Sequence, residues 1–239
     1  MTNEQEISHG TEYRLSQAQD GRLLNLKQIA EDFIQNRLPS LDEGERKGPT
    51  DESAIEAING RSRNHSDRES DLLDWLKHYK VLRYFPVDKS REIANQIIEY
   101  ADGSRPAPRL PDKSSIITEY ERLERRIIQA APLCPKSGKP RDVTSLTAKA
   151  LWCCYPHDIP IFDSHAERSL HVMSRLLRMA PEPTQSKYAA FLDVWLQVYD
   201  EVRPVIEKAD LDGYPYKVRV LDRLLWYLGK PSFDATHSG

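Results

Sequence analysis

The chain of 239 residues has only three cysteines, two of them adjacent. Three cysteines do not build the disulfide framework typical of small secreted domains. Long apolar runs are also missing, since none approaches the ~20 residues that a membrane-spanning helix needs. The N-terminus is polar and acidic, without the basic start and apolar core of a signal peptide. We therefore expect a cytoplasmic protein that does not associate with membranes.

Spacings typical of metal and nucleotide sites are absent too. The cysteines do not have zinc-finger spacing. His165 and Glu167 would fit a zinc deaminase only with a downstream Pro-Cys-x-x-Cys, and no cysteine follows Cys154. The Lys-Ser-Gly-Lys run at 136–139 does not have the spacing of a phosphate-binding P-loop. We expect no metal and no cofactor.

The chain has a net charge of −3, and its charged residues are unevenly distributed along the sequence. Residues 1–60 carry 12 acidic and 6 basic side chains, whereas residues 61–239 carry 25 acidic and 28 basic ones. Between residues 105 and 141 there are 9 basic side chains against 4 acidic ones. A local basic patch is sufficient for phosphate contacts, because affinity depends on the charges that face the nucleic acid. The alternative is that these charges solvate helix faces.

Apolar residues recur at helical spacing along most of the chain, and no segment alternates with a period of two. The pattern predicts an all-α fold of roughly eight to ten helices. Residues 1–20 have no periodicity and are expected to form a mobile tail. Proline-rich residues 105–111 predict a linker, which gives an N-terminal helical part over 21–104 and a second part over 105–239. Polar residues 59–70 are expected to form a loop.

The most informative stretch runs from Thr144 to Leu170. Lys149 lies early in a predicted helix, among apolar neighbours. Pro156 and Pro160 end that helix and force an extended link, because proline cannot continue a helix. Asp163 stands where the next helix begins. A lysine attacks carbon only as a neutral amine, so Lys149 and Asp163 are candidates for a catalytic pair. Their alternatives are a lysine whose head reaches water and an N-cap supported by a Ser164–Glu167 capping box.

This order of helix, lysine, short return, extended Pro-Ile-Phe-Asp segment and second helix resembles the active-site segment of helix-hairpin-helix (HhH-GPD) DNA glycosylases. It is most similar to their 8-oxoguanine DNA glycosylase-like bacterial branch, whose last helix is similar to residues 216–230. The resemblance implies a multi-helix HhH-GPD fold and DNA as partner. It further implies that Lys149 is the nucleophile and Asp163 the catalytic aspartate. Cys153 matches a cysteine that some members place one turn after the lysine.

The implied reaction is removal of an oxidised or otherwise modified base, in DNA repair or antiphage defence. The base would leave the stack and enter a pocket. Asp163 would stabilise positive charge on the sugar, and Lys149 would form a Schiff base that permits strand cleavage. Trp152, Tyr155 and Phe162 are candidates to stack on the base, with packing between helices as their alternative role.

The hairpin of these enzymes usually has glycines that hold a DNA phosphate, but the matching residues 142–148 have none. Side chains are therefore expected to contact the DNA backbone instead, namely those of Lys136, Lys139, Arg141, Ser145 and Thr147. A second hypothesis, from another class, is a catalytically inert helical module that binds nucleic acid or a protein.

Overall fold

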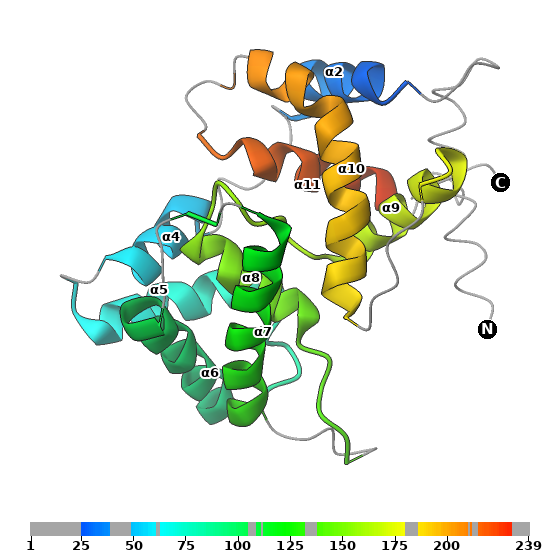
Figure 1. The fold of residues 1–239 in the computed structure, drawn as a ribbon. Helices are drawn as coiled ribbons and strands as arrows, with labels where there is room; N and C mark the ends of the chain where they lie inside the picture. The colour runs from blue at the N-terminus through cyan, green and yellow to red at the C-terminus, as the bar shows by residue number, and fades with distance from the viewer. Residues whose placement is uncertain are drawn as a thin grey trace, which may run out of the picture. The chain divides into compact units, whose positions relative to one another are not determined.

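The computed structural model describes residues 25–38, 49–60, 63–104, 109, 110, 112–131, 138–179, 186–209, 211 and 215–230. Within these ranges the chain forms nine α-helices and one π-helical turn, and no strand (Figure 1). The all-α prediction is therefore confirmed. The predicted mobile tail over residues 1–20 lies outside the described residues.

The elements follow one another along the chain as α2 (Leu26–Asn36), α4 (Asp51–Asn59), α5 (His65–His78), α6 (Val87–Glu99), the π-helical turn η1 (Tyr100–Ser104), α7 (Lys113–Ala130), α8 (Thr144–Cys154), α9 (Ser164–Leu176), α10 (Lys187–Lys208) and α11 (Lys217–Gly229). Several begin at polar residues whose side chains accept a hydrogen bond from the first turn. Asn25, Thr50 and Asp112 cap α2, α4 and α7 in this way. Such caps satisfy N–H groups that have no partner inside the helix.

The helices group into two compact units. The first unit comprises residues 1–40 and 162–239, and the second comprises residues 41–161. The linker expected at residues 105–111 therefore falls inside the second unit, where α6 and α7 on either side of it pack together.

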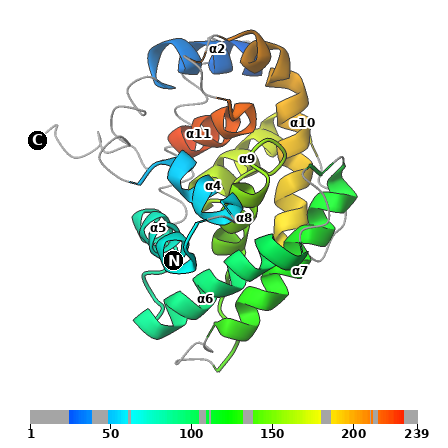
Figure 2. The same ribbon diagram turned by 90° about the vertical axis from the view of Figure 1, so that its left-hand side faces the viewer.

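In the first unit, α11 packs along α9, and α10 packs against α2 (Figure 2). The contact between α9 and α11 is close. Ser169 Oγ donates to Leu225 O over 2.7 Å, and Arg168 donates to Gly229 O over 2.8 Å. A Cβ on Gly229 would lie 1.9 Å from His165 O, so only glycine fits there. Lys217 donates to carbonyls at the end of α10, where a cation is favoured by the helix dipole.

In the second unit, buried Arg68 joins three segments. Its guanidinium donates to Ala57 O over 2.7 Å and to Ile58 O over 2.8 Å, at the end of α4. It also makes two 2.9 Å hydrogen bonds to the carboxylate of Asp102 in η1. Arg68 lies in the first turn of α5, which begins at His65 after the Asn64 cap. The expectation of a loop over residues 59–70 is therefore wrong for residue 59, which ends α4, and for residues 65–70, which belong to α5.

Candidate functional site

Helix α8, which carries Lys149, is buried on almost all sides. Ten of its eleven residues are buried, and only Ser145 is not. A helix that is apolar all round is expected in the interior of a domain rather than on its surface. Within the second unit α8 packs against α4 and α7. Its lysine is thus held by a helix in the interior of this unit.

The side chain of Lys149 is enclosed, with only 2% of the residue exposed. Its Nζ donates to Ser145 Oγ, one turn earlier, over 2.8 Å. The same Nζ lies 5.8 Å from the centre of the Tyr79 ring, a distance at which a lysine amine and an aromatic face interact. The alternative in which the lysine head reaches water is therefore wrong for this structure.

A buried carboxylate and two aromatic residues continue this polar cluster. Asp51, in the first turn of α4, is 7% exposed. Its Oδ1 accepts hydrogen bonds from Trp75 Nε1 and from Tyr79 OH, each over 3.2 Å. Tyr79 therefore contacts both the carboxylate of Asp51 and the amine of Lys149. We define Asp51, Trp75, Tyr79, Ser145 and Lys149 as the α8 polar cluster.

The sequence analysis missed Asp51, Trp75 and Tyr79. Trp75 and Tyr79 are four residues apart, so their spacing places them on one face of a helix. Asp51 gave no signal of its own, because an acidic residue in the first turn of a helix usually stabilises the helix end from the surface. Packing of α4 on α5 buries it.

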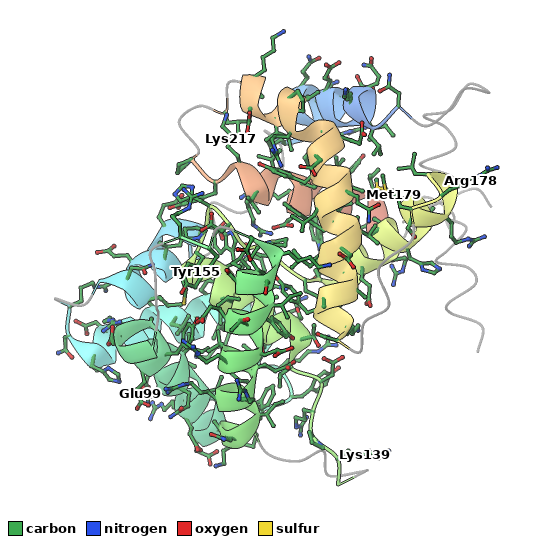
Figure 3. All side chains as sticks on the ribbon, in the orientation of Figure 1. Glu99, Lys139, Tyr155, Arg178, Met179 and Lys217 are labelled. Carbon is green, nitrogen blue, oxygen red and sulfur yellow. The ribbon has the colours of Figure 1, made fainter. Side chains whose placement is uncertain are left out.

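The predicted base-contacting residues of the second unit are buried. Trp152 is 0% exposed and stacks on Trp75, with ring centres 6.0 Å apart and planes at 11°. Cys153 is also 0% exposed, and its carbonyl accepts a hydrogen bond from Asn59. Tyr155, labelled in Figure 3, is 1% exposed. In this structure they fill the packing role, and contact with a base stays a prediction.

Close to Tyr155, a buried tyrosine is kept protonated. Tyr100 OH donates to Glu119 Oε2 over 2.6 Å, and both residues are buried. Burial is the main cause that raises the pKa of Tyr100, and the neighbouring Cys154 and Glu119 raise it further. The hydroxyl is therefore a permanent donor that fixes the carboxylate of α7 against η1.

Asp163 lies in the first unit, at the start of α9. Its backbone is extended, and its Oδ1 accepts a hydrogen bond from His165 N over 2.9 Å, as an N-cap does. Glu167, expected to form a capping box with Ser164, instead pairs with Lys187 over 3.3 Å. Asp163 therefore caps the helix, and a catalytic role for its carboxylate stays a prediction.

Phe162 precedes Asp163 and is anchored within the first unit. Its ring meets that of Phe191 edge to face, with centres 5.1 Å apart, and Lys187 Nζ lies 4.8 Å from its centre. The chain passes from the second unit to the first between Ile161 and Phe162. Lys149 and Asp163 thus belong to different units, and the pairing of their side chains stays a prediction.

The residues expected to contact the DNA backbone have different environments. Lys139 is exposed on the segment before α8 (Figure 3), and Arg141 on the same segment is half-buried. Ser145 accepts the hydrogen bond from Lys149. Thr147 is 0% exposed, and its Oγ1 has no hydrogen-bond partner among the described residues. Lys136 lies outside the described residues. Of the four described candidates, Lys139 is exposed and Arg141 is half-buried on the segment before α8, and contact of any of them with DNA stays a prediction.

At the N-terminus of α8, the carboxylate of Asp142 is bound to the helix. Asp142 Oδ1 accepts a hydrogen bond from Thr144 N over 2.9 Å. A helix N-terminus attracts anions, because its N–H groups are unsatisfied and its dipole is positive. The Asp142 carboxylate therefore takes one of the N–H groups at the start of α8.

Among the described residues, no group of three or more His, Cys, Asp or Glu side chains is arranged to hold a metal ion. None of the described helices is both long and apolar enough to cross a bilayer.

Comparison with known proteins gave no match to a family model, a curated protein or a solved structure.

Proposed function

We propose that this protein is a DNA N-glycosylase, with β-lyase activity, that excises an oxidised or otherwise modified base. The observation that supports it most is the enclosure of Lys149, whose amine bonds to Ser145 while only 2% of the residue is exposed. Burial disfavours the ammonium form of lysines in general, and the neutral amine is the nucleophile. A buried lysine with an acceptor on one side suits this chemistry better than an ordinary surface lysine does.

In the proposed reaction the bond between the base and C1′ breaks, and the base takes the bonding electrons. The Asp163 carboxylate stabilises the positive charge that develops on the sugar. The Lys149 amine bonds to C1′ and gives one proton to the departed base, which leaves neutral. The C1′–O4′ bond then breaks, the second amine proton passes to O4′, and a Schiff base forms. Loss of a C2′ proton then breaks the bond from C3′ to the phosphate oxygen, the phosphate leaves with that electron pair, and the strand is cleaved. Ser145 acts as a positioning residue, because its hydroxyl accepts one N–H of Lys149.

Borohydride trapping tests the proposal. The full-length protein is incubated with oligonucleotides that contain 8-oxoguanine, an abasic site or a modified cytosine, and reduction converts a Schiff base into a stable adduct. Lys149→Gln should give no adduct. Asp163→Asn should slow base release by roughly 10²–10³-fold and should still fold, because asparagine is also a good N-cap.

Lys77→Gln is the matched control, since Lys77 lies in the same unit but is 60% exposed and pairs with Asp74. This variant should form the adduct as the wild type does. Far-ultraviolet circular dichroism checks that Lys149→Gln is folded. An adduct that persists in folded Lys149→Gln would contradict the proposed nucleophile.

The second candidate is an inert helical module that binds nucleic acid or a protein. Two carboxylate contacts favour it, since Asp163 caps α9 and Asp142 occupies the start of α8. The trapping experiment separates the two. Binding of an oligonucleotide with neither an adduct nor base release would support the inert module.

A further inference from the structure

An aromatic residue is strongly exposed on the loop that joins α5 to α6. Tyr84 is 64% exposed, and Val87, three residues on at the start of α6, is 74% exposed. We define residues 80–87 as the Tyr84 loop, which belongs entirely to the second unit.

The Tyr84 loop is held by its own hydrogen bonds. Lys80 has a positive φ of 57°, Lys80 N donates to Lys77 O, and Val81 N donates to Leu76 O. This pattern closes the end of α5 as a Schellman motif does. A further turn forms where Phe85 N donates to Leu82 O over 2.9 Å, and Leu82 is buried beneath it. The exposed ring thus stands on a hydrogen-bonded base, which lowers the entropy cost of binding.

Two arginines lie against the aromatic rings of this loop. The Arg83 guanidinium lies 4.4 Å from the centre of the Tyr84 ring. The Arg141 guanidinium, from the segment before α8, lies 5.3 Å from the centre of the Phe85 ring. Neither arginine forms an ion pair within the described part of the chain. A guanidinium held at a ring face keeps N–H groups available for phosphate oxygens.

The acidic groups nearest in sequence do not neutralise these arginines. Asp88 lies in the first turn of α6, where a helix N-terminus favours a carboxylate. Asp142 is bonded to Thr144 N. Lys80 adds a third cation to the loop and forms no ion pair among the described residues. The surface therefore combines aromatic rings with unneutralised cations, the composition of single-strand binding grooves.

We propose that the Tyr84 loop binds an unpaired stretch of DNA, with one base stacked on Tyr84 and with Arg83 and Arg141 bound to the adjacent phosphates. Unpaired nucleotides fit this surface, because a duplex hides the base faces inside its stack. The choice of DNA rests on the proposed function, whereas the stacking and phosphate contacts rest on the loop itself.

Fluorescence anisotropy of a labelled twelve-residue oligothymidylate, titrated with the full-length protein, tests this. Tyr84→Ala should weaken binding roughly 5- to 150-fold, which corresponds to the ~1–3 kcal/mol lost when a stacking aromatic is removed. Tyr84→Phe keeps the ring and should stay within about twofold of wild type. Because Tyr84 is exposed, circular dichroism should show the same helicity in all three proteins.

The arginines are tested by the dependence of affinity on salt. Arg83→Gln and Arg141→Gln should each reduce the slope of log K against log salt by about 0.7, the value for one phosphate of a single strand. Arg91→Gln is the matched control, since Arg91 lies on α6 in the same unit and has a side chain 65% exposed. It removes the same charge and should leave the slope unchanged.

Three kinds of result would overturn the inference. The first is that Tyr84→Ala binds as tightly as wild type, or that Arg91→Gln reduces the slope of log K against log salt as much as Arg83→Gln does. The second is equal or tighter binding of the matching RNA oligonucleotide or of a blunt-ended, fully paired DNA duplex. The third is self-association that depends on Tyr84 without oligonucleotide binding, which would make the loop an interface between copies.

Failure of this inference differs from failure of the proposed function. Binding that depends on Tyr84 without any borohydride adduct would refute the glycosylase and leave the Tyr84 loop as proposed. Conversely, suppose that the wild-type protein forms an adduct and that Tyr84→Ala binds the oligothymidylate as tightly as wild type. That result would support the glycosylase and refute the proposed role of the Tyr84 loop.

Discussion

Replacement of Arg68 by methionine should remove much of the stability of the second unit. Methionine keeps the apolar stem and removes the four hydrogen bonds of the guanidinium. The carbonyls of Ala57 and Ile58 lose their donor, and a buried acceptor without a partner costs about 1–3 kcal/mol. Asp102 loses its cation, but its side chain is 36% exposed, so water solvates it.

The two carbonyls therefore dominate, and at about 1–3 kcal/mol each we expect the free energy of unfolding to fall by about 2–6 kcal/mol. This loss is a large part of the ~5–15 kcal/mol that stabilises a typical domain. Urea unfolding followed by circular dichroism measures it. Hydrogen exchange of peptides that span α4 and α5 assigns the loss to the second unit, because local opening there should become faster.

Arg63→Met is the matched control for this prediction. Arg63 makes one 2.7 Å contact, with Asp71, and both side chains are partly exposed. Its loss should leave the unfolding midpoint nearly unchanged, as for most surface ion pairs. Equal losses for the two arginines, or a loss below ~1 kcal/mol for Arg68→Met, would refute the account of Arg68 as the joint between α4, α5 and η1.

Two further predictions concern a glycine and a glutamate. Gly229→Ala should destabilise the first unit by at least ~1–3 kcal/mol, because its Cβ would meet His165 O, whereas Gly103→Ala has nothing within 4 Å and should cost far less in the same urea titration. Burial and, more weakly, the Asp142 charge raise the pKa of Glu124, although its hydrogen bond with Tyr120 opposes this. The folded state therefore holds that proton more tightly, so this group's contribution to stability falls as pH rises above about 4.5, the ordinary value. Stability measured from pH 4 to 8 should consequently decline less steeply for Glu124→Gln than for wild type, and parallel curves would contradict this.

The positions of most helices could be predicted from the sequence, because periodicity and caps act over a few residues. The helix with Lys149 and the start of the next one at Asp163 are examples, since Pro156 and Pro160 separate them whatever their surroundings. The start of α5 could not be predicted in this way. Residues 65–70 are polar, and their helix is stabilised by Arg68, whose partners lie about 10 and 34 positions away.

The sequence by itself determined that this chain is helical, that Lys149 has apolar neighbours and that Asp163 begins a helix. Only the tertiary structure decided that the Lys149 amine is buried against Ser145 and Tyr79, that Asp51 is buried with Trp75, and that Arg141 lies on Phe85. The reason is physical. Local propensity depends on residues a turn apart, whereas the cost of burying a charge depends on partners that only packing brings together.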